Sequence, residues 1–135
     1  MLIHFLSLIT SFVGTFIAME FTQKLLKGLP VGSSYFAETP IHGVTYGEVL
    51  ASLLLILTFA FCIGVAHGLL FRKAQLEAIA IAASLPVLIM VFALGAVTLG
   101  MGLIILPIVF FYGMTVKYGV KKGGYLRASL MEEIK

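Results

Sequence analysis

The chain has 135 residues, of which 61% are hydrophobic and only 11% are charged, with a formal net charge of +3. A soluble globular domain carries roughly a quarter charged residues and a disordered chain is poor in apolar ones, so this composition excludes both classes for the bulk of the sequence. The length suits one domain, and Cys62, as the only cysteine, excludes an internal disulfide and cysteine-based zinc sites.

The first apolar segment, residues 1–19, carries no charged side chain. We expect a helix over residues 2–27, because Glu20 and Lys24 form an i,i+4 pair beyond the apolar core and Gly28 then favours its end. The segment lacks the basic start and the small-residue cleavage site of a secretory signal peptide, so we expect it to be retained as a membrane span.

A long loop is expected over residues 28–45, where Gly, Ser and Pro are frequent. The second helix is expected over residues 46–70, because Thr45 and Glu48 have the spacing of a capping box. In this motif the threonine oxygen accepts from a first-turn amide and the glutamate reaches back to the cap. Residues 72–75 contain neither Gly nor Pro, so the charged residues Arg72 and Lys73 are the only indication of a turn before the third helix.

The last charge-free stretch, residues 78–116, holds 39 residues. A membrane core about 30 Å thick is crossed by roughly 20 helical residues, so this stretch must turn back once. Glycines gather at residues 95–102 and predict the turn there. We therefore expect the third and fourth spans over residues 75–95 and 98–118, followed by a basic cytoplasmic tail over residues 119–135.

Proline falls inside both of these spans, at Pro86 and Pro107. Each removes a backbone hydrogen bond and clashes with the preceding turn, so we expect a kink at each position. Such breaks can frame a binding site, although proline is also tolerated in ordinary membrane helices, and both interpretations stay open.

The predicted fold class is an all-α integral membrane protein, with four transmembrane helices in an antiparallel bundle and both termini cytoplasmic. Basic loops are retained on the cytoplasmic side, and this orientation puts seven Lys and Arg residues inside against two outside. The inner ones are Arg72, Lys73, Lys117, Lys121, Lys122, Arg127 and Lys135, and the outer ones are Lys24 and Lys27. Tyr46 and Tyr112 fall near predicted span ends, where tyrosine rings suit the membrane interface.

Several function classes are excluded by what the spans lack. No charged side chain falls at membrane depth, whereas proton-driven transporters and rotor rings need an ionisable group there. The chain has no aspartate and no HExxH motif, and its serines lack a credible base, so we expect no catalytic residue, no metal site and no enzyme activity. The basic residues of segment 117–127 follow a span directly, so we assign them to topology and lipid headgroups and expect no nucleic acid partner.

Small residues recur at four-residue intervals on two of the predicted helices. The second helix carries Ala60, Gly64 and Gly68, and the first carries Ser7 and Ser11. A stripe of small residues lets another helix approach closely, which drives association where lipid removes the hydrophobic incentive. We expect these two faces to pack on each other within the chain, with a contact between chains as the alternative.

The histidines are the candidate cofactor ligands of the sequence. With both termini inside, His4 and His67 fall at similar depth near the cytoplasmic ends of the first two helices. Two neutral imidazoles on facing helices can hold a b-type haem. Near an interface a histidine more often meets water or a carbonyl group, so we expect no cofactor and keep haem b as the alternative; His42, in the outer loop, is expected to be a surface residue.

The absence of catalytic groups and the packing stripes together favour a structural role. We predict a non-catalytic membrane subunit that scaffolds a larger membrane protein assembly, such as an energy-converting or respiratory one. The alternative is a small pore or permease formed by self-association, and a haem-binding electron-transfer anchor is the third hypothesis. The expected partners are the lipid bilayer and either other membrane protein chains or copies of this chain.

Overall fold

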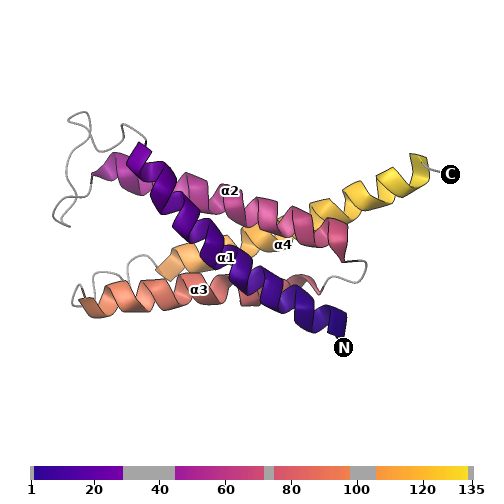
Figure 1. Cartoon of the computed structure of the whole chain (residues 1–135), viewed down its shortest axis with the longest axis horizontal. Coiled ribbons are helices and arrows are strands. Elements are labelled where there is room, and N and C mark those ends of the chain that lie inside the picture. The colour runs from indigo at the N-terminus through magenta and orange to yellow at the C-terminus, as the bar shows by residue number, and fades with distance from the viewer. Residues whose placement is uncertain (1, 29–44, 72–74, 98–105, 134–135) are drawn as a thin grey trace.

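Four α-helices make up the computed structural model, which describes residues 2–28, 45–71, 75–97 and 106–133 (Figure 1). They are α1 (Leu2–Gly28), α2 (Tyr46–Leu70), α3 (Leu76–Val97) and α4 (Leu106–Glu133). Consecutive helices run in opposite directions, so α1 begins and α4 ends at the same end of the bundle, here termed the terminal end (Figure 1). His42, most of the predicted loop over residues 28–45 and most of the turn over residues 95–102 lie outside the described residues.

Local sequence sets the start of α2. The Thr45 hydroxyl accepts a hydrogen bond from the Glu48 amide, and the Thr45 amide donates to Oε2 of Glu48 at 2.8 Å. This capping box confirms the predicted start at Tyr46. On α1 the expected ion pair is also present, with Nζ of Lys24 lying 3.2 Å from Oε1 of Glu20.

Three helices, α1, α2 and α3, are each long and apolar enough to cross a membrane, as expected for a multi-pass membrane protein. Residues 98–105 of the predicted fourth span lie outside the described residues, and α4 continues to Glu133 through residues expected to form a tail. Pro107 is the second residue of α4, where a helix has no backbone hydrogen bond to lose. The structure therefore corrects the expectation of a kink at Pro107, whereas Pro86 does lie inside α3 and is buried there.

The tightest helix contact among the described residues joins α2 and α4, which run parallel. Gly64 and Gly68 of α2 face Gly119 and Gly123 of α4, and these four residues form the glycine seam. A Cβ atom on Gly64 would lie 2.9 Å from the Cα of Gly119, and one on Gly68 would lie 2.9 Å from the Cα of Gly123. No side chain fits between the two backbones, so glycine is required for this approach.

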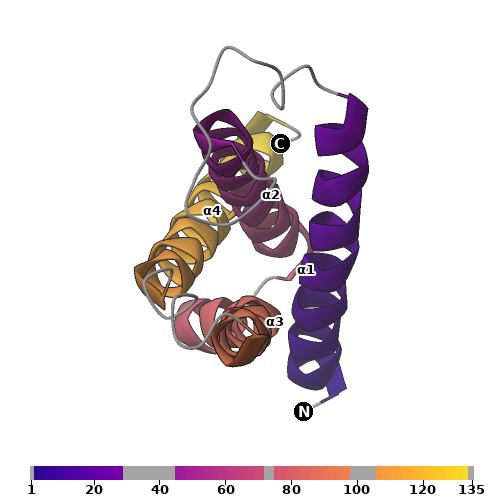
Figure 2. The same ribbon diagram turned by 90° about the vertical axis from the view of Figure 1, so that its left-hand side faces the viewer.

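The first helix packs beside α2 and α3, on the side away from α4 (Figure 2). Its buried residues all carry a hydroxyl group, and they are Ser7, Ser11, Thr15 and Thr22. Its large apolar side chains face outward, with Phe5 62% exposed and Ile17 60% exposed. A helix that is polar inside and apolar outside suits a surrounding of lipid, where apolar side chains need no burial.

The glycine seam can be tested at two adjacent positions. We expect Gly123→Ala to lower the free energy of unfolding by about 1 to 3 kcal/mol, because the new Cβ would meet the Val65 carbonyl and the Cα of Gly68. At Gly124 a new Cβ meets nothing within 4 Å, so Gly124→Ala should raise the free energy by up to about 1 kcal/mol through helix propensity. Unfolding titrations in detergent micelles measure both, and equal effects at the two positions would contradict the seam.

Candidate functional site

A line of polar contacts on the inner face of α1 reaches every other helix. The Ser11 hydroxyl donates to the carbonyl oxygen of Ile79 on α3 at 3.2 Å, and the hydroxyls of Thr15 and of Tyr112 on α4 share a hydrogen bond of 2.9 Å. The carbonyl oxygen of Ser7 lies 3.1 Å from Nε2 of His67 on α2. These contacts tie α1 to its three neighbours, and Ser7, Ser11, Thr15 and Thr22 are termed the hydroxyl stripe.

Tyr112 is part of the buried core and not an interfacial residue. It is 1% exposed and packs with Ala60, Ala83 and Val116. The structure thereby corrects the expectation drawn from its place near a predicted span end. A buried phenol needs a hydrogen-bond partner, and Thr15 supplies it. The spacing of hydroxyl residues along α1 is the sequence signal that points to such a partner.

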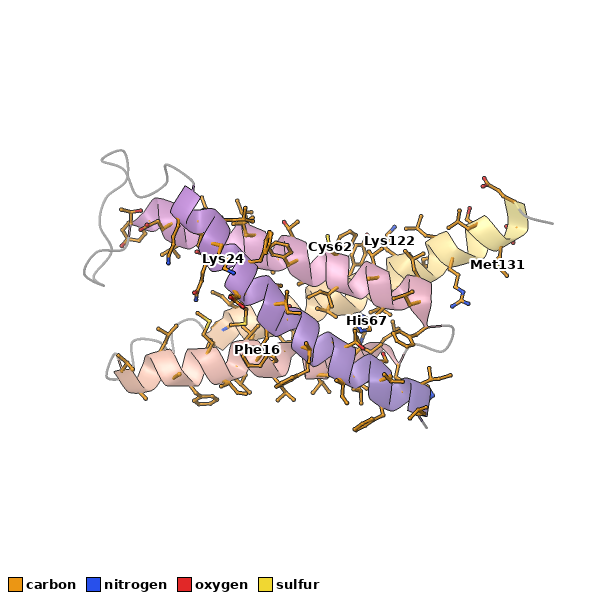
Figure 3. All side chains as sticks on the ribbon, viewed as in Figure 1. Phe16, Lys24, Cys62, His67, Lys122 and Met131 are labelled. Carbon is orange, nitrogen blue, oxygen red and sulfur yellow. The ribbon has the colours of Figure 1, made fainter. Side chains whose placement is uncertain are left out.

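His67 lies between α2 and α1 (Figure 3). Both of its ring nitrogens lie against backbone oxygens. Nδ1 lies 2.8 Å from the carbonyl oxygen of Ile63 on the same helix, and Nε2 faces Ser7 as described. The ring also stacks on Phe71, with centroids 5.6 Å apart. A haem iron needs a ring nitrogen with a free lone pair, so His67 as placed does not fit an axial ligand.

The two candidate histidine ligands are not brought together as a pair. His4 is half-buried about one turn before Ser7, and no hydrogen bond or ring contact within the described helices joins it to His67. The Ser7 hydroxyl is buried and has no hydrogen-bond partner among the described residues. Because His67 contacts the Ser7 carbonyl and not the hydroxyl, the two residues do not form a nucleophile and base either.

The small residues of α2 are buried, but the glycines among them face α4. Ala60, Gly64 and Gly68 are all buried, and the two glycines contact Gly119 and Gly123. The spacing of small residues predicts the serines of α1 at this face, and the structure corrects that pairing. Gly119 and Gly123 repeat the four-residue spacing of the α2 glycines. The prediction does not use this signal, because the charged residues place the end of the predicted fourth span at residue 118, before both glycines.

An open groove of about 650 Å³ lies between α3 and α4 and is termed the α3/α4 groove. Its less exposed lining residues include three small ones, Ala80, Ser84 and Gly113. Its exposed lining residues include large apolar ones, Ile81, Leu85, Leu106, Phe110 and Met114. Toward the terminal end, Nζ of Lys117 donates to Oε1 of Glu77 at 3.0 Å and joins the two helices.

The buried polar side chains of the described helices and their caps are hydroxyls and one imidazole. Such groups hold helices together by hydrogen bonds across their interfaces. Comparison of the chain with protein-family models, with curated proteins and with solved structures gives no match. Function therefore has to follow from the packing and from the surfaces that the packing leaves open.

The Thr15–Tyr112 hydrogen bond can be measured with a double-mutant cycle. Between Thr15→Val and Tyr112→Phe we expect a coupling free energy of roughly 0.6 kcal/mol, the average for such bonds in membrane helices. Thr10 is the matched control, because it is exposed and donates only to the Leu6 carbonyl of its own helix. Thr10→Val and Tyr112→Phe should therefore be additive, and additivity in the Thr15 cycle as well would contradict the contact.

The two serines of the hydroxyl stripe should respond differently to alanine. We expect Ser7→Ala to be neutral or to raise the free energy of unfolding by up to about 1 kcal/mol, because a buried hydroxyl without a partner is removed. Ser11→Ala loses the bond to the Ile79 carbonyl and should lower the free energy by about 0.5 to 1.5 kcal/mol. Thermal unfolding in detergent measures the stability of both variants. A Ser7→Ala variant that is less stable than Ser11→Ala would contradict these contacts.

Proposed function

We propose that this chain is a non-catalytic membrane subunit whose α3/α4 groove receives a helix of another membrane protein. The observation that carries the proposal is the groove itself, in which Ala80, Ser84 and Gly113 lie between large exposed apolar side chains. Side-chain ridges of a helix pack into such grooves, and the large apolar side chains at the rim would be covered by the incoming helix.

The other small-residue surfaces are already occupied within the chain. The glycine seam binds α2 to α4, and the hydroxyl stripe faces α2, α3 and α4. Their residues are buried and unavailable to a partner. Ser84 and Gly113 contact each other between α3 and α4, and the apolar α3/α4 groove beside them stays open for an incoming helix.

We further infer that all four helices cross the bilayer, with both termini in the cytoplasm. The glycine seam aligns α4 with α2, which is long enough to span a membrane, and residues 106–116 of α4 carry no charge. The α4 residues toward the terminal end include Lys117, Lys121, Lys122 and Arg127. This excess of basic residues is typical of the cytoplasmic side.

A pore or permease formed by self-association is the alternative from another functional class. A pore requires polar groups that face a shared channel. The hydroxyl stripe faces inward and forms its hydrogen bonds within one chain, which favours the scaffold over the pore. A second copy of the chain in the groove is a competing outcome, and the experiment below separates it from an unlike chain.

Blocking the groove should release the partner. Ile81 and Ile89 both lie on α3 and are 63% and 55% exposed, but only Ile81 lines the groove. We expect Ile81→Trp to reduce the assembled fraction by about tenfold, because overpacking an interface costs roughly 1 to 3 kcal/mol. Ile89→Trp is the matched control and should leave the assembly intact. Native mass spectrometry after mild detergent extraction gives the composition of each complex.

The outcomes of this experiment separate the scaffold, the pore and a chain that functions alone. Unlike chains at fixed stoichiometry, lost in Ile81→Trp and kept in Ile89→Trp, would support the scaffold. A homo-oligomer that conducts solute in liposomes would support the pore and refute the scaffold. Recovery of the wild-type chain as a lone monomer would refute both.

A further inference from the structure

A small pocket at the terminal end is separate from the α3/α4 groove and has a different chemistry. Its volume is about 240 Å³, and it lies where α2 ends, α3 begins and α4 passes both. The lining residues used below are Gly68 and Phe71 from the end of α2, Leu76 from α3, and Lys121, Gly124 and Arg127 from α4. This set is termed the terminal pocket.

Two cations line the terminal pocket without a counterion among the described residues. Nη1 of Arg127 is buried and has no hydrogen-bond partner there. The nearby acid Glu77 is bound by Lys117 at 3.0 Å, so it does not neutralise Lys121 or Arg127. Lys122 is engaged elsewhere, with Nζ lying 5.6 Å from the centroid of the Tyr118 ring. Two positive charges that line one pocket repel each other, and an anion bound there would offset this repulsion.

The start of α3 adjoins the terminal pocket through Leu76. Leu76 is the first residue of α3, and the first backbone hydrogen bond at this end runs from the Ile79 amide to the Gln75 carbonyl at 3.0 Å. The amides of a first helical turn have no acceptor within the helix, and the helix dipole makes this end partly positive. Such helix starts bind phosphate and other anions.

Glycine keeps the terminal pocket open. A Cβ atom on Gly124 would meet nothing within 4 Å, so the space beside this residue is free. Gly68 is packed against the α4 backbone and leaves no such space, so the open side of the pocket lies at Gly124.

From the pocket, its two unpaired cations and the adjoining helix start, we propose that the terminal pocket binds a phosphate group. Arg127 supplies a planar fork suited to phosphate oxygens, Lys121 supplies a second positive charge, and the adjoining start of α3 adds the positive end of its helix dipole. The phosphate is carried either by the headgroup of an anionic phospholipid or by a soluble phosphate ester, since both present the same oxygens. The site is independent of the helix-binding role proposed for the α3/α4 groove.

The test uses the full chain in maltoside detergent, which contains no phosphate. Phenylglyoxal modifies arginine, and mass spectrometry separates Arg127 from Arg72, the only other arginine of the chain. Short-chain phosphatidylglycerol and glycerol 3-phosphate are titrated at constant ionic strength, with chloride as the reference. We expect at least one of them to protect Arg127 with saturation. Protection by the lipid alone assigns a headgroup site, and protection by both assigns a general phosphate site.

Variants distinguish a built site from general surface charge. In Lys121→Gln, the concentration of phosphate compound that gives half-maximal protection of Arg127 should rise about tenfold, because a charge-assisted hydrogen bond is lost. Lys122→Gln removes the same charge from the adjacent residue, which does not line the pocket, and should change the affinity less than about twofold. Equal losses of about fivefold in both variants would indicate surface attraction only and overturn the proposal.

The wild-type measurement keeps the proposal testable if a variant fails to fold. Absence of protection of wild-type Arg127 by either phosphate compound would overturn the site, whatever the variants do. Arg127→Gln provides an independent check by thermal unfolding. If the phosphate compounds stabilise this variant as much as the wild type, Arg127 does not bind the phosphate group and the proposal is wrong.

Discussion

The helices of this chain meet through glycine, serine and threonine as well as through an apolar core that includes Ile79, Val87, Tyr112 and Val116. Most large apolar side chains of α1 turn outward. In lipid, an apolar side chain gains little from burial, so helices are held by close backbone approach and by hydrogen bonds across their interfaces. The glycine seam provides the first kind of contact between α2 and α4, and the hydroxyl stripe provides the second between α1 and its neighbours. The exposure of Phe5 and Ile17 follows from the same constraint.

The glycine seam also determines where the open surfaces lie. With α4 bound to α2 through its glycine face, α3 approaches α4 at Ser84 and Gly113, and the α3/α4 groove is left beside this contact. At the terminal end the seam brings Lys121 and Arg127 of α4 to the last residues of α2. Both candidate binding surfaces thus depend on one backbone contact, although an apolar helix would fill the first and an anion the second.

Local features of the fold are predictable from the sequence, whereas the choice of helix partners is not. The capping box of Thr45 and Glu48 depends on residues three positions apart, so spacing alone predicts it. The partner of the α2 glycines depends on Gly119 and Gly123, which charge counting assigns to a tail because lysines interrupt the apolar run. The burial of Tyr112 is not predicted either, because an interfacial tyrosine ring and a buried, hydrogen-bonded one have the same local sequence. The terminal pocket combines three helix ends, which sequence spacing does not relate.

The inward orientation of the hydroxyl stripe is tested most directly by spin labels placed along α1. Cys62 is exposed and is the only cysteine, so Cys62→Ser gives a background for single labels in bilayers. Collision rates with dissolved oxygen should peak at Ile9 and Ile17, which face outward, and should be lowest at Ser11 and Thr15, which are buried. Peaks at Ser11 and Thr15 would contradict a first helix that turns its hydroxyls toward the other three.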